Sequence, residues 1–341
     1  MHPPLLVTDD SDLLDDLVRL SAAAGVALDV APDLRTALRL WAGAPLVLVG
    51  QDLAPDLAAQ ATPRRGEVFV LARDEPDFRS AVALGARDVL SLPEEDDQVV
   101  ELLADVGDGG ARSALTIGVT GGSGGVGATT LACAVAGAAA RSGRVLAMDL
   151  DPWGPGVGRV LGVDPLGLTW RELVGSRGRL GSRALRDALP RQGDLAVLGW
   201  GEADPTVDEV AVRDVLAAAQ RGHDLVVVDL PRREDPWVEE VAGRCDHVLL
   251  VAGCSVLGAA SAMRALASLR AMSGSIQLVA RTSGRAVPAD VLASALDLPL
   301  VACLGQQRGL DEQLDLGLGP LHNPKGAVAR AAAQVLERLA R

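Results

Sequence analysis

One glycine-rich segment holds the residues whose types and spacing are best suited to chemistry. It follows an apolar run and opens a helical pattern, and its sequence is Gly121-Gly122-Ser123-Gly124-Gly125-Val126-Gly127-Ala128-Thr129-Thr130. Glycines let the backbone turn tightly so that its N–H groups approach phosphate oxygens, and the N-terminus of the following helix favours negative charge. We therefore interpret the segment as a loop that binds a nucleotide or another anion, and not as a turn that serves packing alone.

Two nucleotide-binding patterns fit this loop, and the first is the dinucleotide fingerprint. Gly122, Gly124 and Gly127 have the G-x-G-x-x-G spacing. Asp149 follows Gly127 by 149 − 127 = 22 residues, where such sites place the acid that binds the ribose. The loop also resembles that of short-chain dehydrogenases, so an NAD(P)-binding oxidoreductase stays open as an alternative. Against it, those enzymes transfer protons through a tyrosine, and this chain has none.

The second pattern is the P-loop, G-x-x-x-x-G-K-[ST]. Gly122 and Gly127 supply its two glycines, and Thr129 supplies the hydroxyl that binds Mg²⁺. Ala128 stands where the lysine is expected. Taken alone, the loop is a P-loop that has lost its main cation.

Carboxylates that follow two later apolar runs favour the P-loop interpretation. One run ends in Asp149, with Asp151 two residues on, and the other ends in Asp229. The carboxyl ends of parallel strands face the crevice in which ligands bind. A single acid there can simply cap a turn. Three acids beside a glycine loop instead indicate a site that holds Mg²⁺ and positions an attacking water.

With these residues the chain resembles the MinD/ParA family of deviant Walker A ATPases over about residues 114–341. The family's loop is Lys-Gly-Gly-x-Gly-Lys-Thr-Thr, and residues 124–127 and 129–130 match it. Asp149 and Asp151 match its Asp-x-Asp, and Asp229 its switch aspartate. The resemblance implies ATP or ADP bound with Mg²⁺ on residues 122–130. It also implies metal binding, directly or through water, by Thr129, Asp149 and Asp229, and catalysis by Asp151 and Asp229 if the site is active.

The chain departs from the family at both lysines. Ser123 replaces the signature lysine, which in the family reaches the partner's nucleotide across a dimer, and Ala128 replaces the P-loop lysine. Loss of the second resembles the CpaE/TadZ branch, which also carries a receiver-like domain in front. Loss of both is similar to the septum site-determining (Ssd-like) proteins of that branch. Arg281 stands where many members place an asparagine that contacts adenine.

The first third of the chain has the strand–helix alternation of a receiver domain, but it lacks that domain's reactive residues. Asp9 and Asp10 end the first predicted strand, as the acids that bind Mg²⁺ do in receivers. The third predicted strand ends near Gly50 with no acid, and Asp52 is expected to lie past the pocket. Leu92 stands where receivers have a lysine before a proline. We expect a protein-binding or dimerising module, not a phosphorelay domain.

The whole chain is predicted to be α/β. A receiver-like (flavodoxin-like) domain over 1–106 and a glycine-rich linker over 107–113 precede a P-loop NTPase-like domain over 114–341. The second domain is expected to have a mostly parallel sheet with helices on both faces, because its strand and helix patterns alternate. A helix over 325–340 carries Val328, Val335, Leu336 and Leu339 on one face. It lacks the aromatic and basic residues of a membrane anchor, so a packed helix is favoured over peripheral membrane contact.

The composition of the chain limits the kinds of binding partner that we expect. The net charge is −13 and no basic cluster occurs, so direct nucleic-acid binding is not expected. The four cysteines and four histidines are scattered, which argues against a zinc site or disulfides and indicates core cysteines in a reducing cytoplasm. No apolar stretch reaches about 18 residues, so no membrane span is expected.

The missing lysines shape the expected function. Losing groups that stabilise transition-state charge lowers rates by about 10²–10³-fold. We expect a cytoplasmic regulatory or localisation protein with a degenerate ATP site. The resemblance implies a homodimer recruited to the septum, a pole or the inner membrane face by protein partners of division or pilus/secretion machinery. The alternatives are an active ATPase in which Arg141 or Arg144 replaces the lysine, and the NAD(P)-binding oxidoreductase.

Overall fold

The chain folds into two compact units. The computed structural model describes residues 2–60, 62–107, 114–163, 167–174, 180–201, 209–233, 235–282 and 287–339. One unit comprises Met1–Arg112 with Gly181–Arg183, and the other comprises Ser113–Leu180 with Ala184–Arg341. Most of the predicted linker, 108–113, lies outside the described residues.

The first unit is built on a parallel five-stranded sheet. Its strands are β1 (Leu5–Val7), β2 (Asp29–Ala31), β3 (Val47–Gly50), β4 (Val68–Ala72) and β5 (Asp88–Ser91). They lie in the order β2-β1-β3-β4-β5, and every pair is parallel. This is the flavodoxin-like order, which brings the ends of β1 and β3 together at the switch point of the sheet. The predicted fold class of this unit is confirmed.

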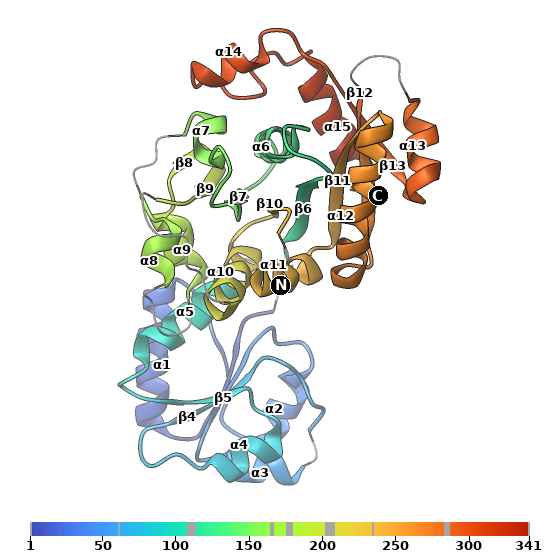
Figure 1. Ribbon diagram of the computed structural model, residues 1–341. Helices are drawn as coiled ribbons and strands as arrows, with labels where there is room; N and C mark the ends of the chain where they lie inside the picture. Colours follow the sequence, from blue (N-terminus) through green and yellow to red (C-terminus); the bar gives the residue numbers. More distant parts are fainter. Residues whose placement is uncertain are drawn as a thin grey trace. The chain divides into compact units, whose positions relative to one another are not determined.

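Helices cover both faces of this first sheet (Figure 1). They are α1 (Ser11–Ala24), α2 (Leu34–Trp41), α3 (Ala54–Ala59), α4 (Phe78–Leu84) and α5 (Asp96–Gly107). Because side chains alternate along a strand, Leu6 and Leu48 face α1 and α5, whereas Val7 and Val49 face α2, α3 and α4. Two apolar layers therefore hold the sheet between its helices.

The second unit contains an eight-stranded sheet. Its strands are β6 (Leu115–Gly121), β7 (Val145–Asp149), β8 (Arg191–Gln192), β9 (Leu195–Leu198), β10 (Leu225–Asp229), β11 (His247–Gly253), β12 (Ile276–Thr282) and β13 (Leu300–Gly305). The order is β13-β12-β11-β6-β10-β7-β9-β8, and only the short β8 is antiparallel to its neighbour. The mostly parallel sheet predicted for this unit is confirmed.

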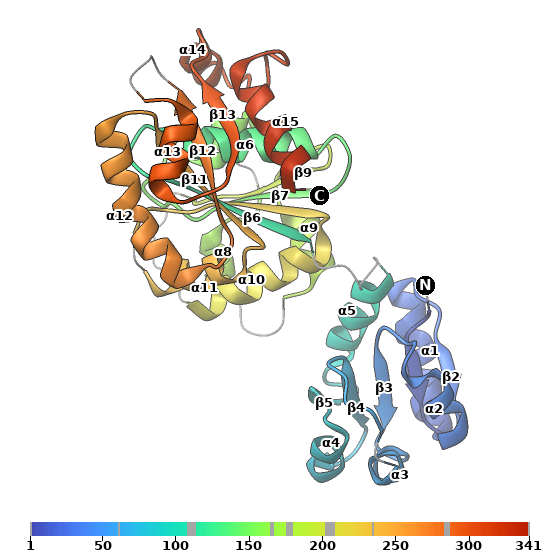
Figure 2. The same cartoon turned by 90° about the vertical axis from the view of Figure 1, so that its right-hand side faces the viewer.

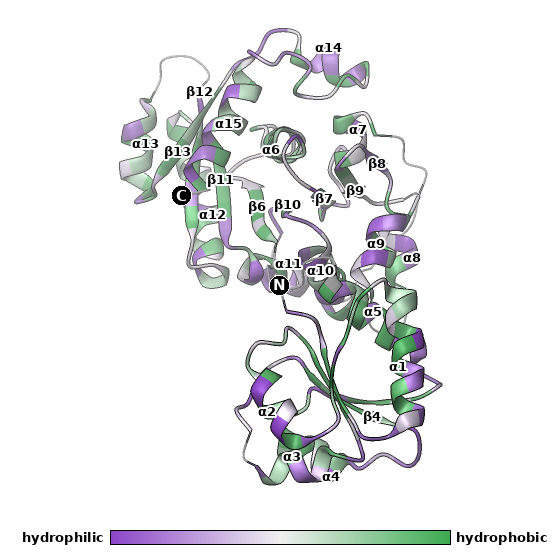
Figure 3. Ribbon diagram, turned by 180° about the vertical axis from the view of Figure 1, so that it is seen from behind, coloured by the Kyte–Doolittle hydropathy of each residue, from purple (hydrophilic) through white to green (hydrophobic). Residues whose placement is uncertain are grey.

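Ten helices are described after residue 113, and they cover both faces of the second sheet (Figure 2); the first two residues of one of them, α9, are assigned to the first unit. One face is covered by α8 (Trp170–Val174), α9 (Ser182–Ala188), α10 (Glu209–Gly222), α11 (Pro236–Arg244), α12 (Val256–Met272) and α13 (Ala289–Leu296). The other is covered by α6 (Ala128–Ala139), α7 (Val157–Leu161), α14 (Leu310–Asp315) and α15 (Ala327–Leu339). Figure 3 shows that the central strands between these layers are mainly apolar, as burial on both faces requires.

The last helix packs on its own unit. Val328 and Val335 of α15 are fully buried in the core shared with α6, and Leu336 and Leu339 pack at the edge of that core. The apolar face of the predicted terminal helix is thus used in packing. None of the described helices is both long and apolar enough to cross a membrane.

The carboxyl ends of β1 and β3 differ from the prediction in the position of Asp52. Its carboxylate turns back over the end of β3, where Oδ1 accepts from Thr8 Oγ1 at 2.9 Å and Oδ2 accepts from the Asp9 N–H at 2.7 Å. The expectation that Asp52 lies past the pocket is therefore wrong. A tight turn after β3 reverses the chain, and glycine at position 50 leaves the space that the carboxylate fills.

The other receiver positions have structural roles. Asp10 caps α1 by accepting from the N–H groups of Asp12 and Leu13 at 2.9 and 3.2 Å. Leu92 is 3% exposed and precedes Pro93 through a cis peptide bond. Leu92 is thus an apolar, buried side chain and supplies no cation where receivers have a lysine.

The Gly50→Ala variant should destabilise the first unit. A Cβ at position 50 would collide with the Asp52 carboxylate and lie 2.7 Å from Thr8 Oγ1, so both hydrogen bonds of Asp52 would be displaced. We expect a loss of about 1–3 kcal/mol, measured by urea unfolding of the full chain. The matched control is Gly66→Ala, where a Cβ meets nothing within 4 Å and should change stability by less than about 0.5 kcal/mol. Equal effects of the two variants would contradict the packing of Asp52 against Gly50.

Candidate functional site

The glycine-rich loop joins β6 to α6 at the carboxyl edge of the second sheet. β6 ends at Gly121 and α6 begins at Ala128. Gly125 and Gly127 adopt φ angles of 69° and 96°, a left-handed conformation that glycine tolerates and other residues rarely adopt. The turn therefore depends on glycine at these two positions.

Two other glycines of the loop are needed for packing. A Cβ at Gly122 would lie 3.0 Å from both Cα and Cβ of Ala262, because α12 crosses directly over the loop there. The Gly122 N–H donates to Val251 O at 2.8 Å, which ties the loop to β11. A Cβ at Gly121 would lie 3.0 Å from Ser123 O. The first half of the predicted nucleotide-binding segment is thus a close-packed support.

The second half of the loop presents unused hydrogen-bond donors. Within the described part of the chain, the N–H groups of Ser123, Gly124, Gly125 and Gly127 donate to no other residue. Gly124 and Gly125 are exposed, and a Cβ at Gly125 would meet nothing within 4 Å. Backbone donors at a helix N-terminus form an anion-binding cradle. The phosphate groups of a nucleotide fit this arrangement.

Two aspartates meet beside the loop. β10 lies between β6 and β7, and Asp229 is in register with Asp149 across the β10–β7 pair. Both side chains are buried, with exposures of 1% for Asp149 and 3% for Asp229. Asp149 accepts from the N–H groups of Asp151 and Val157 at 3.0 and 2.9 Å. Adjacent parallel strands thus bring together two acids that are 80 residues apart (229 − 149 = 80).

Burial strongly affects the ionisation of this pair. Desolvation raises the pKa of Asp149 to about 6. Desolvation, with the charges of Asp149 and Asp151, raises the pKa of Asp229 to about 8, although a hydrogen bond with the Thr129 side chain opposes the rise. At neutral pH the Asp229 carboxyl therefore carries a proton unless a cation is present to replace it.

The donor set fits a magnesium ion that arrives with a nucleotide. Asp149, Asp229 and the Thr129 hydroxyl supply oxygen atoms, which Mg²⁺ prefers, and Thr129 is hydrogen-bonded to Asp229. In the described residues no group of three or more His, Cys, Asp or Glu is placed to hold a metal by itself. Mg²⁺ commonly takes one or two carboxylates plus phosphate and water oxygens, which matches this set.

Asp151 and its neighbours line a cavity next to Asp149. Asp151 is half-buried, and its Oδ1 accepts from the Trp153 N–H at 3.2 Å. Trp170 is buried and its Nε1 donates to Asp149 O at 2.7 Å, so the indole positions the segment after β7. Asp149 and Asp151 both border a cavity of about 400 Å³. The sequence-predicted acids Asp149, Asp151 and Asp229 are thus brought to one edge.

The strand order does not match a dinucleotide-binding fold. In that fold the acid that binds the ribose ends the strand next to the glycine-loop strand. Here β10 separates β6 from β7, so Asp149 does not end the neighbouring strand. The spacing of 22 residues between Gly127 and Asp149 (149 − 127 = 22) therefore does not indicate a ribose-binding acid.

Arginines proposed from the sequence lie elsewhere. Arg144 precedes β7 at the opposite end of the strand and pairs with Asp224 at 3.5 Å. Arg141 follows α6, whose 12 residues span about 18 Å from the loop. Arg141 and Arg144 therefore lie too far from the glycine loop to replace its lysine, and this alternative is wrong. Arg281 donates to Gly305 O at 3.1 Å and so links β12 to β13.

One cation beside the loop was missed. Arg232, in the turn after β10, lies with Nη2 3.6 Å from the position of a Cβ at Gly124. The sequence places this arginine only three residues after Asp229 and says nothing about its direction.

Three of the four cysteines, Cys133, Cys245 and Cys254, are buried as expected, whereas Cys303 is exposed.

Solved structures share the fold of the second unit. A ParA family ATPase from Chlorobium tepidum TLS superposes with a TM-score of 0.58 at 17% identity, over 67% of this chain and 99% of that one. The septum site-determining protein MinD from Pyrococcus horikoshii OT3, solved with Mg-ADP, superposes with a TM-score of 0.57 at 20% identity, over 66% of this chain and 96% of that one. The second unit therefore has a MinD/ParA-like ATPase fold.

Sequence comparison gives the family. Residues 7–114 match the family model described as Rv3660c-like, CheY-like N-terminal domain. The chain is 33% identical to the protein Rv3660c of Mycobacterium tuberculosis (strain ATCC 25618 / H37Rv), an alignment that covers 97% of this chain and 96% of that protein. The chain belongs to the Rv3660c-like family, in which a CheY-like domain precedes a region with the MinD/ParA-like fold.

The Asp229→Asn variant should be more stable than the unsubstituted chain at neutral pH when a chelator is present. Because the pKa of Asp229 is raised on folding, its stabilising contribution is complete below about pH 4 and is lost as pH rises towards 8. The amide has no charge to bury, so we expect a gain of more than about 1 kcal/mol at pH 7.5 and less at pH 5.5, measured by urea unfolding.

The control for this variant is Asp290→Asn, an exposed acid in the first turn of α13. Its effect should stay below about 0.5 kcal/mol at both pH values. A stability difference for Asp229→Asn that does not grow with pH would show that the Asp229 carboxyl is not desolvated as described.

Proposed function

We propose that the second unit binds ATP or ADP with Mg²⁺ and hydrolyses ATP very slowly or not at all. The observation that carries this proposal is the meeting of the donor-rich loop with Asp149, Asp229 and Thr129 at one sheet edge. The same edge lacks both lysines of the deviant P-loop, because Ser123 and Ala128 occupy their positions. Binding groups are thus retained where the groups that stabilise transition-state charge are lost.

The residues divide the binding task in a simple way. The N–H groups of the loop hold phosphate oxygens, and Thr129 with Asp149 and Asp229 holds Mg²⁺ directly or through water. Mg²⁺, when bound, neutralises part of the phosphate charge. The Asp151 backbone N–H is hydrogen-bonded to Asp149, and in this proposal the Asp151 carboxylate accepts a hydrogen bond from the attacking water. Because both lysines of the family's loop are missing, less positive charge faces the phosphates, and we expect weak occupancy and slow turnover.

The biological role we propose is that of a nucleotide-sensing localisation protein. Support comes from the fold shared with MinD, named as a cell division and septum site-determining protein, and from a CheY-like unit without an acid at position 50. We propose that the chain forms a homodimer in the cytoplasm. We further propose that protein partners of the division or pilus/secretion machinery recruit it to the septum, a pole or the inner membrane face.

Thr129→Ala should abolish most of the Mg²⁺-dependent affinity for ATP. The substitution removes a hydroxyl that is hydrogen-bonded to Asp229, so binding of Mg·ATP measured by calorimetry should weaken at least about tenfold. Thr129→Ser, which keeps the hydroxyl, should bind within about threefold of the unsubstituted chain. With EDTA in place of Mg²⁺, the three proteins should bind alike; a Thr129→Ala protein that binds Mg·ATP normally contradicts the site.

Ala128→Lys should strengthen Mg·ATP binding by at least about tenfold, because it returns a cation to the phosphate loop. The matched control is Ser142→Lys, which adds the same charge in the exposed turn after α6 and should leave affinity within about twofold. If both lysine variants change affinity equally, the gain comes from overall charge and the P-loop alignment is wrong.

Titration separates the remaining alternatives. Tight NADP(H) binding without binding of Mg·ATP or Mg·ADP would favour an oxidoreductase and overturn the proposal. Steady ATP turnover that is lost in Asp151→Ala would instead indicate a working ATPase. The proposal expects Mg·nucleotide binding with no turnover above that of Asp151→Ala.

A further inference from the structure

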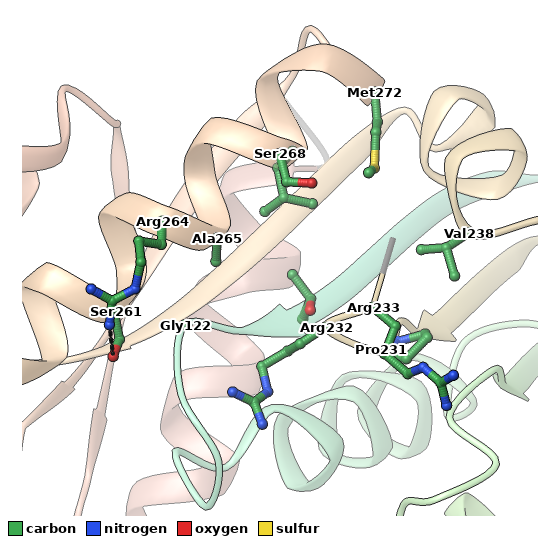
Figure 4. Close-up of a pocket in the computed structure, with 12 residues that line it drawn as sticks. Gly122, Pro231, Arg232, Arg233, Val238, Ser261, Arg264, Ala265, Ser268 and Met272 are labelled. Carbon is green, nitrogen blue, oxygen red and sulfur yellow. Dashed lines mark hydrogen bonds between the residues drawn. The ribbon is translucent and has the colours of Figure 1, made fainter. Parts of the chain in front are cut away.

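Arg232 approaches the phosphate loop from the turn that follows β10. Apart from residues 123–125 themselves, its Nη2 is the one described atom within 4 Å of the position of a Cβ at Gly124. Figure 4 shows the Arg232 side chain extending towards the loop that carries Gly122, whereas Arg233 extends away from it. A Cβ at position 124 would be in ordinary van der Waals contact with Nη2, so the guanidinium lies directly beside the loop.

The charge of Arg232 is not used by another part of the described structure. No described carboxylate lies within ion-pair distance of it, whereas Arg233 Nε lies 3.4 Å from Asp235 Oδ2. Arg232 is also largely exposed. An unpaired guanidinium next to the free N–H groups of Gly124 and Gly125 adds a full positive charge to the backbone cradle.

A cavity next to the loop brings further positive charge close to Arg232. Its volume is about 310 Å³, and Gly122, Arg232 and Arg264 are among its lining residues. Arg264, on α12, donates to Ser261 Oγ at 3.4 Å and also has no carboxylate partner among the described residues. Arg233 borders the same cavity, although its Nε pairs with Asp235, and the rest of the lining combines hydroxyls with apolar side chains and includes no acid among the described residues.

We propose that Arg232 is the phosphate-binding cation of this site and replaces, within the same chain, the lysines lost at positions 123 and 128. This inference rests on the proposed nucleotide binding. A guanidinium is permanently charged and can donate two parallel hydrogen bonds to phosphate oxygens. Gly124 directly follows Ser123, so Arg232 stands beside the position from which the signature lysine is missing.

The assignment also connects the nucleotide to the rest of the unit. Arg232 lies three residues after Asp229 and four before Pro236, where α11 begins. A phosphate group held by both Arg232 and the loop would fix the turn that joins β10 to α11. The number of phosphates on the nucleotide would thus set how firmly this turn is held.

The test compares two neighbouring arginines in the full chain. Arg232→Ala and Arg233→Ala remove the same charge, one residue apart, from exposed positions that do not endanger folding. Calorimetric titration with Mg·ATP should show at least about tenfold weaker binding for Arg232→Ala and a change within about twofold for Arg233→Ala. Arg232→Lys keeps the charge but lacks the paired N–H donors of a guanidinium, so its affinity for Mg·ATP should lie between those of Arg232→Ala and the unsubstituted chain.

The salt dependence gives a second readout that a merely structural role would not move. Affinity of the unsubstituted chain for Mg·ATP should fall with added KCl more steeply than that of Arg232→Ala, because one screened charge contact is gone. Equal losses in Arg232→Ala and Arg233→Ala, or equal salt slopes with and without Arg232, overturn the inference.

Failure of the inference and failure of the proposed function are distinguishable. If Thr129→Ala loses Mg·ATP binding while Arg232→Ala keeps it, the site is a nucleotide site and Arg232 is not its cation. If the unsubstituted chain binds neither Mg·ATP nor Mg·ADP, both proposals are overturned together.

Discussion

The position of β10 between β6 and β7 is the constraint on which the second unit's site depends. Parallel pairing in register places the ends of β10 and β7 side by side, so Asp229 and Asp149 become neighbours. The same pairing places β10 next to β6, whose end feeds the glycine loop. The position of this one strand thus brings a donor-rich loop and two acids to one edge of the sheet. It also buries two carboxyl groups whose ionised forms are more stable in water, which raises their pKa.

Burial of those carboxyls indicates a site and not a structural ion pair. In the described residues, neither Asp149 nor Asp229 is paired with an arginine, and their hydrogen bonds come from backbone N–H groups and from Thr129. Folding keeps such an arrangement only if other contacts compensate, and strained or unpaired polar groups gather where proteins bind ligands. A cation with bound phosphate is the species that would relieve the repulsion. Compared with the MinD/ParA loop that the sequence resembles, both lysines are absent here, whereas two buried acids lie beside the loop.

The sequence predicted the framework because the framework follows from local pattern. Apolar runs such as 225–229 are long enough to identify buried strands, and α1, α6 and α12 carry helical patterns of ten or more residues. Helices α3, α7, α8 and α14 were not predicted, because each has six residues or fewer and is stabilised by packing more than by local preference. The longer helices α11 and α13 were missed as well. Asp52 and Arg232 were misjudged or missed because their roles depend on the direction of a turn, which residue order does not encode.

Tryptophan placement gives the second unit a built-in optical reporter. Trp170 is 1% exposed, its indole N–H is bonded to the backbone of Asp149, and its ring centroid lies 5.8 Å from that of Trp200. Indole emission depends on hydrogen bonding and on neighbouring rings, so this pair is sensitive to small movements of the segment after β7. With no tyrosine in the chain to contribute, its ultraviolet fluorescence comes almost entirely from five indoles, and one of them touches the candidate site.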